Sequence, residues 1–258
     1  MKKVFTIANQ KGGVGKTTTC MNLGVALARK GKKVLLIDSD PQANLTSYLG
    51  VNPGDEAKTL DEIYISKRPI LDARGFIATT SAGVHLIPAD RGLSGVEYYL
   101  FTRSDREMVL SVFLENVKDE YDVILIDTPP SLNLLTLNAL CASDGVLIPV
   151  QAEFFSLEGI IKIRDEIEKI RNRWNPNLSI YGVLPTQISM RRKLTQEVLD
   201  TLQAELGSAI FKSMIHDNAA VTESSGHAQS VLDYDRKSRG ARDYIAAADE
   251  FIARGLLK

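Results

Sequence analysis

The sequence predicts an α/β fold: a mostly parallel, twisted sheet with helices on both faces, in one domain that spans residues 1–258. Two observations support this. Short apolar and β-branched runs alternate along the chain with segments of helical periodicity, and three of the runs end at a glycine-rich or acidic segment. The chain has 258 residues, of which 44% are hydrophobic, so it can bury a full core.

The first strand, at residues 4–8, leads into a glycine-rich loop. Residues 9–18 read Asn-Gln-Lys-Gly-Gly-Val-Gly-Lys-Thr-Thr, and a helix is predicted over 17–29. A strand, a glycine-rich turn and a helix N-terminus form a cradle for phosphate, because backbone N–H groups and the helix dipole favour an anion there. In such a loop Lys16 reaches the β- and γ-phosphates, and the Thr17 hydroxyl holds Mg²⁺.

The loop departs from the standard phosphate-loop pattern, since Gln10 stands where a glycine is usual and a second lysine, Lys11, lies near its start. It resembles the deviant Walker A loop of the ParA/Soj and MinD group of P-loop ATPases. The resemblance implies that Lys11 reaches across a dimer interface to the partner's nucleotide, and that Lys11, Lys16 and Asp40 are catalytic. It also implies a set of nucleotide-binding residues: Lys11, Gly12, Gly13, Val14, Gly15, Lys16, Thr17 and Thr18.

The second strand, at 34–37, ends in the acidic segment Asp38-Ser39-Asp40. Open parallel sheets bind ligands at the carboxyl ends of their strands, which places these carboxylates near the phosphate loop. The segment resembles the switch I sequence of the same group. By that resemblance Asp40 positions the attacking water and Asp38 supports the metal shell.

The middle of the chain is less distinctive. We expect a short helix at 57–65, a strand at 84–89 and an amphipathic helix at 104–118. His85 is interpreted as a strand residue and not as a ligand, because nothing in the sequence pairs with it.

The run 123–126 is apolar and ends at Asp127, which is the Walker B form. Asp127 is therefore predicted to hold Mg²⁺, so that the metal set is Thr17, Asp38 and Asp127. Residues 128–131 resemble switch II, and the helix expected at 133–141 could sense the γ-phosphate.

The rest of the chain continues the alternation. Strands are expected at 146–150 and 180–184. Helices are expected from about 156 to 174, over 194–206 and over 240–254, the last with Ile245, Ala248, Phe251 and Ile252 facing the core.

Two clusters of cations are candidates for contact with DNA phosphates, and a loop between them departs from the family pattern. The candidates are Arg191, Arg192, Lys193, Arg236, Lys237 and Arg239. His216 and Asp217 stand where the family often has proline and arginine, so one expected DNA contact is missing, and Ala220 replaces a further arginine.

The resemblance implies an ATP- and Mg²⁺-dependent partition ATPase with slow hydrolysis. Its ATP-bound homodimer would bind DNA without sequence preference, and a ParB-like centromere-binding protein would stimulate turnover. A formal net charge of −1 agrees with local cation patches and not with a global basic field. We expect a cytoplasmic, nucleoid-associated chain with no membrane partner and no N-terminal helix-turn-helix extension.

Other functions stay open. A MinD-like membrane-positioning ATPase would need a basic amphipathic terminal helix, but Asp249 and Glu250 lie just before the terminal residues 251–258. A ParA-like ATPase that positions a protein cargo is a further alternative. A redox relative would need cluster cysteines, and the chain has only Cys20 and Cys141, both in apolar helical contexts.

Overall fold

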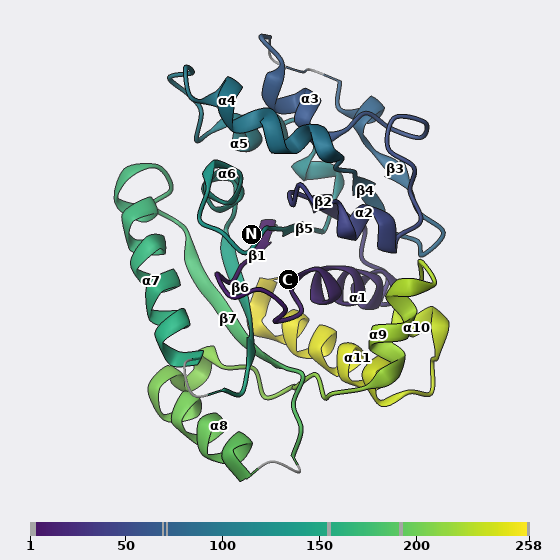
Figure 1. The fold of residues 1–258 in the computed structure, drawn as a ribbon, viewed down its shortest axis with the longest axis vertical. Helices are drawn as coiled ribbons and strands as arrows, with labels where there is room; N and C mark the ends of the chain where they lie inside the picture. The colour runs from purple at the N-terminus through teal and green to yellow at the C-terminus, as the bar shows by residue number, and fades with distance from the viewer. Residues whose placement is uncertain (1–3, 69, 71, 154–155, 191–192, 257–258) are drawn as a thin grey trace.

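The computed structural model describes residues 4–68, 70, 72–153, 156–190 and 193–256, which form one seven-stranded sheet between helical layers (Figure 1). The strand order is β3-β4-β2-β5-β1-β6-β7, and every neighbouring pair is parallel except β3–β4. This confirms the predicted α/β class. The strands are β1 (Val4–Ile7), β2 (Val34–Asp38), β3 (Ala78–Thr79), β4 (His85–Ile87), β5 (Val123–Asp127), β6 (Gly145–Gln151) and β7 (Ser179–Thr186).

The helices connect successive strands and then close the chain at its end. The helices are α1 (Lys16–Arg29), α2 (Asn44–Tyr48), α3 (Leu60–Ile65), α4 (Val96–Leu100), α5 (Val109–Leu114), α6 (Leu134–Cys141), α7 (Ser156–Arg173), α8 (Lys193–Leu206), α9 (Ala219–Gly226), α10 (Val231–Tyr234) and α11 (Arg239–Phe251). Short 3₁₀ turns occur at Arg74–Phe76, Arg91–Gly95, Lys118–Glu120 and Gly207–Ala209, and a π-helical turn at Ile252–Leu256 continues α11.

Alternate residues of each central strand enter opposite faces of the sheet, as the period of two requires. On one face Phe5, Leu36 and Leu125 pack with α1 and α11. On the other face Leu35 and Ile124 pack with the helices α3 to α6. Helix α7 covers β6 through its own apolar cluster, as Figure 1 shows at the left of the sheet. Both faces are therefore buried, and the central strands read as continuous apolar runs.

Two sequence predictions about helices were wrong in part. The helix expected over 104–118 is only α5, and within it Val112 is 54% exposed. In α11 the buried face runs through Tyr244, Ala248 and Phe251, whereas Ile245 is exposed. Helical spacing alone does not show which residues form the centre of a helix's apolar face, because tertiary contacts decide which side of the helix packs against the sheet.

The parallel register brings the expected acidic strand ends together. Asp38 of β2 pairs with Asp127 of β5, and Asp127 pairs with Ile7 of β1. The loops that follow these three strands therefore meet at one edge of the sheet, which is the edge where open α/β sheets bind ligands.

Candidate nucleotide-binding site

The glycine-rich loop has the backbone that its glycines allow. Gly13 and Gly15 have φ values of 74° and 85°, a region that other residues rarely adopt. Helix α1 begins directly after Gly15, with no side-chain cap and no acidic residue in its first turn. Its first N–H groups and the positive end of its dipole are therefore uncompensated by side chains, which suits an anionic ligand.

Side chains from β7 and from the residue after it fix this loop in place. The Thr186 hydroxyl donates to the Val14 carbonyl at 2.8 Å, and Gln187 Nε2 donates to the Gly13 carbonyl at 2.7 Å. Both carbonyls are thereby turned toward β7. The loop is preorganised by residues 170 or more positions away in sequence.

Lys16 is buried, and its ammonium Nζ donates to the Lys11 carbonyl at 3.1 Å. Burial lowers the pKa of Lys16, whereas the nearby charges of Asp127 and Asp40 act in the opposite direction. An ammonium has three donors. A bound phosphate would supply further acceptors and offset the cost of burying the charge.

Asp127 is fully buried, and neither of its carboxylate oxygens has a hydrogen-bond partner among the described residues. Burial raises the pKa of Asp127 well above its usual range, and the charge of Asp38 adds to the rise, while Thr17 and Lys16 oppose it. A buried carboxylate with free lone pairs next to a hydroxyl is the oxygen donor set that Mg²⁺ takes, usually with waters and substrate phosphates. Thr17 and Asp127 thus fit a magnesium ion.

Asp38 and Asp40 occupy different positions in the loop after β2. Asp38 Oδ2 accepts from the Thr46 N–H at 2.8 Å and its hydroxyl at 2.7 Å, and Oδ1 accepts from the Asp40 N–H at 3.2 Å. Burial raises the pKa of Asp38 to about 6, although these hydrogen bonds lower it. Among the described residues, the Asp40 carboxylate accepts one hydrogen bond, from the Gln42 N–H at 2.9 Å. Asp38 therefore holds the loop and the start of α2, and Asp40 lies within the loop that it holds.

Lys11 is half exposed, unlike Lys16. Its ammonium is within hydrogen-bond distance of Gln151 Oε1, at 3.0 Å, and forms an ion pair with Glu153. Both partners lie at or just beyond the end of β6. An exposed ion pair of this kind is worth at most about 1 kcal/mol, so Lys11 can exchange it for another anion at little cost.

A hollow of about 290 Å³ lies beside the phosphate loop and was not predicted. Its lining brings Gly15 and Thr18 together with Thr186 and Gln187, the segment 215–218, and residues of α9 and α11. His216 Nδ1 is 2.9 Å from Asp243 Oδ2, which also accepts the His216 N–H. Apart from the phosphate-loop residues Gly15 and Thr18, the sequence signals at this hollow were the departures of His216 and Asp217 from the family pattern.

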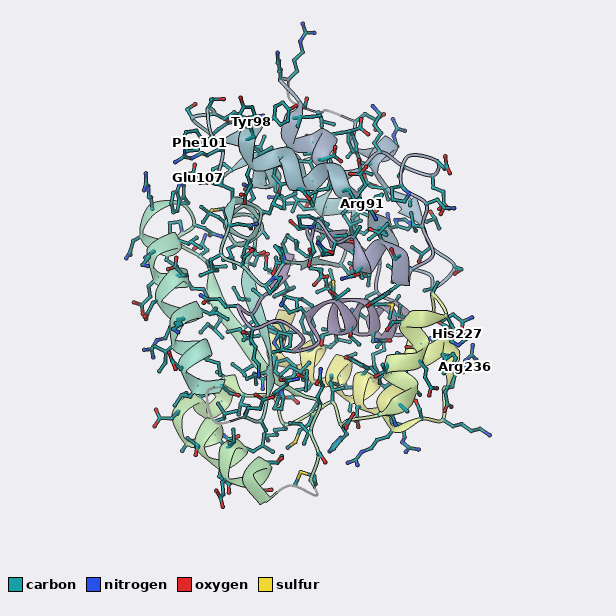
Figure 2. All side chains as sticks on the ribbon, in the orientation of Figure 1. Arg91, Tyr98, Phe101, Glu107, His227 and Arg236 are labelled. Atoms are coloured by element: carbon teal, nitrogen blue, oxygen red, sulfur yellow. The ribbon has the colours of Figure 1, made fainter. Side chains whose placement is uncertain are left out.

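The cation candidates are only partly described. Arg236, Lys237 and Arg239 are exposed around the N-terminus of α11, and none forms an ion pair with a described residue; Figure 2 shows Arg236 at the outer edge of this region. Arg191 and Arg192 lie outside the described residues, as does the side chain of Lys193, which begins α8. Asp217 is exposed.

The sheet, the loop before α1 and the strand-end Asp127 define a P-loop nucleoside triphosphatase with a second lysine in its loop. A family model described as an AAA domain matches residues 2–180. ParA, a chromosome partitioning protein of Caulobacter vibrioides, is 42% identical over 98% of this chain and 94% of its own. The sporulation initiation inhibitor protein Soj of Bacillus subtilis is 42% identical over 99% of this chain and 100% of its own.

The chain therefore belongs to the ParA/Soj family of P-loop ATPases. The structural comparison agrees. Cobyrinic acid a,c-diamide synthase of Mycobacterium smegmatis, crystallised with ADP and magnesium, is similar with a TM-score of 0.83 and 33% identity, over 98% of this chain and 94% of that chain.

The orphaned carboxylate gives a first testable prediction. Asp127→Asn is expected to raise the free energy of unfolding of the nucleotide-free protein at pH 8 by about 1–2 kcal/mol, because it removes a buried negative charge beside Asp38. The pKa values of Asp38 and Asp127 are raised in the folded state. At pH values above about 3.8 these carboxyl groups have therefore lost their protons in the unfolded state but still hold them in the folded state. Stability should therefore fall as pH rises through about 6, the folded value of Asp38, and less so in the variant.

Urea unfolding of both proteins at pH 5 and pH 8 measures this difference. The increase in the free energy of unfolding caused by Asp127→Asn should be larger at pH 8 than at pH 5. A variant that is less stable than wild type at pH 8, or that differs equally at both pH values, would contradict the assignment of an uncompensated carboxylate.

Proposed function

We propose that this protein is an ATP-dependent partition ATPase whose ATP-bound homodimer binds DNA without sequence preference and releases it on hydrolysis. The observation that carries the proposal is the combination of an open phosphate loop with two lysines in different states. Lys16 is buried among carboxylates, and Lys11 is exposed on a replaceable ion pair. One lysine is built for a nucleotide in the same chain and the other is available to a second chain.

In this proposal the loop residues 11–18 hold the phosphates of ATP, with Lys16 at the β- and γ-phosphates. Thr17 and Asp127 hold Mg²⁺, and Asp38 supports that shell mainly by fixing the loop after β2. When bound, Mg²⁺ neutralises charge on the phosphates. A relative named chromosome-partitioning ATPase Soj, from Treponema pallidum, and the neighbour crystallised with ADP and magnesium support the proposal.

Asp40 is proposed to orient the water that attacks the γ-phosphate. It lies on the loop fastened by Asp38, and its carboxylate oxygens have one hydrogen bond from a described residue, the Gln42 N–H. Phosphoryl transfer depends chiefly on positioning and charge stabilisation, so a carboxylate at this place need not be a strong base. A slow intrinsic rate that an activating ParB-like partner raises agrees with a site that is incomplete in one chain.

Dimerisation is proposed to move Lys11 from Glu153 to the nucleotide of the second chain. The ion pair of Lys11 is about half exposed, with side-chain exposures of 48% and 52% for the two partners. A triphosphate offers several negative charges and should displace one exposed carboxylate. The dimer would also double each cation patch, which raises affinity for a polyanion steeply.

The DNA-binding part of the proposal is tested by a charge swap at the exposed cluster. Arg236→Glu/Lys237→Glu/Arg239→Glu should weaken ATP-dependent binding to a random-sequence duplex by at least tenfold at 50 mM salt, since phosphate contacts dominate such binding. Arg171→Glu/Arg173→Glu on α7 serves as a matched control at another exposed site. Fluorescence anisotropy with ATP, with ADP and without nucleotide, at two salt concentrations, gives the readout.

Binding that needs ATP, falls with salt and is lost in the first variant only would support a nucleoid-associated partition role. Absence of DNA binding in every nucleotide state would contradict that role. A membrane-positioning function or a protein cargo would then be the next candidate. None of the helices in the described part of the chain is long and apolar enough to cross a bilayer.

The hollow beside the loop is proposed to take the adenine nucleoside. Asp243 fixes the His216 tautomer with the proton on Nδ1, so Nε2 is a hydrogen-bond acceptor. An acceptor suits the exocyclic amino group of adenine and disfavours the O6 acceptor of guanine. His216→Ala should weaken ATP binding about tenfold, which is about 1.4 kcal/mol, and leave weak GTP binding unchanged.

Calorimetry with ATP and with GTP measures the ratio of the two affinities directly. His227→Ala is the control, because His227 follows the end of α9 and stacks on Tyr234. An equal loss for both nucleotides would show that His216 only supports its loop. An unchanged ATP affinity would remove it from the site.

A further inference from the structure

Helix α4 and the residue after it carry an exposed aromatic cluster that the nucleotide site does not use. Tyr98, Tyr99 and Phe101 are 84%, 58% and 72% exposed. Figure 2 shows Tyr98 and Phe101 together at the outer edge of α4. Contiguous exposed apolar surface of this kind costs hydration free energy and usually marks a binding site. We call these three side chains the aromatic surface.

The aromatic surface borders a hollow of about 700 Å³ between α3 and α4. Residues 64–67, from the end of α3 and the segment after it, line one side, and residues from Glu97 to Arg103 line the other. The volume is large enough for two or three side chains of a peptide. A short segment with apolar or aromatic side chains therefore fits this shape.

The charges at the hollow favour an acidic occupant. Its one lining carboxylate, Glu97, already accepts the Leu134 N–H at 3.2 Å. Arg103 is also engaged, because it pairs with Asp105 and donates to the carbonyls of Tyr64 and Ser66. Lys67 of the lining and its chain neighbour Arg68 are exposed, and neither forms an ion pair with a described residue. The available charge beside the aromatic surface is therefore positive.

The same region is bonded directly to helix α6, which follows the predicted switch II. The Glu97 bond reaches the first residue of α6. Asn138 of α6 accepts from the Leu110 N–H at 3.2 Å and donates to the Arg106 carbonyl at 2.7 Å. A ligand that shifts α4 therefore acts on the first residue of α6 through Glu97, while Asn138 ties the middle of α6 to α5 and to the residues before it.

We propose that the aromatic surface and its hollow bind a short segment of a partner protein that carries apolar or aromatic side chains together with acidic ones, and that its binding alters ATP hydrolysis through α6. The proposed effect on ATP hydrolysis rests on the proposed function, whereas the proposed binding does not. A symmetric contact between two copies of this surface would place Lys67 and Arg68 against the same cations, which disfavours a second copy as the occupant.

The binding test uses a phage-displayed library of random 12-residue peptides, selected on the full chain with ATP and depleted on Tyr98→Ser/Phe101→Ser. We expect enrichment of peptides that combine aromatic or aliphatic residues with Asp or Glu. A synthetic copy of the leading peptide should bind the double-serine variant at least tenfold more weakly. The variant Lys67→Glu/Arg68→Glu should bind the same peptide at least fivefold more weakly. A selection on this variant should enrich basic peptides instead.

Binding is refuted by three results: no enrichment, equal affinity for the double-serine variant, or the same acidic preference in the charge-swapped variant. Light scattering without peptide tests whether a second copy of the chain occupies the aromatic surface. A wild-type dimer that the double-serine change dissociates would also refute the proposal. Both variants must keep wild-type ATP affinity, which separates a failed surface from a failed nucleotide site. A saturating peptide that changes hydrolysis less than twofold overturns the link to α6.

Discussion

Lys16→Ala is expected to raise the dissociation constant for ATP by at least 100-fold, which is about 2.7 kcal/mol. The ammonium is buried beside Asp127 and Asp40 and donates to the Lys11 carbonyl, so its remaining donors are placed for phosphate oxygens. Charge-assisted hydrogen bonds in a water-poor site are the strong ones, and alanine supplies none of them.

Titration calorimetry with Mg-ATP measures the loss. Lys162→Ala is the matched control, because it removes an exposed lysine of α7 whose ion pair in the described part of the chain is with Glu158. Both variants should unfold at similar temperatures. Retained ATP affinity in Lys16→Ala would refute the phosphate-loop assignment, whatever the behaviour of the control.

Asp40→Ala is expected to keep ATP binding and to lower the hydrolysis rate at least 100-fold. The change removes the carboxylate proposed to orient water, but it leaves the Asp40 N–H that donates to Asp38 and the bonds from Asp38 to Thr46. The loop after β2 should therefore keep its shape, so that catalysis fails without loss of binding.

Steady-state phosphate release, run beside calorimetry, separates the two effects. Asp55→Ala, in the exposed segment after α2, is the control. A variant with unchanged hydrolysis would contradict the switch I assignment, and one that loses ATP affinity in parallel would show that Asp40 supports the site and does not act in turnover.

The central strands and the phosphate loop were predictable because their signals are local. The apolar runs at 4–8, 34–37 and 123–126 are buried, so their secondary structure did not depend on which side of the element faces the core. The glycines of the loop are needed for backbone reasons, and Lys16, Thr17 and Asp127 meet because parallel strands end at one edge. Sequence spacing therefore predicted which residues of the phosphate loop and of the strand ends come together at this edge.

The hollow proposed for the adenine nucleoside was not predictable, because the residues that line it are far apart in sequence. Thr186, His216 and Tyr244 line one hollow although no spacing links them. The same limit applies to α5 and to Ile245, where the side of a helix that faces the sheet depends on neighbours that the pattern does not contain.

The central claim is that ATP joins two chains through Lys11, and molar mass measured by light scattering tests it most directly. Asp40→Ala should be a dimer with Mg-ATP and a monomer with ADP, because hydrolysis no longer removes the bridging triphosphate. Asp40→Ala/Lys11→Ala should bind ATP and stay monomeric, since the lysine on the Glu153 ion pair is gone. A monomer in ATP for the single variant, or a dimer for the double variant, would contradict the account.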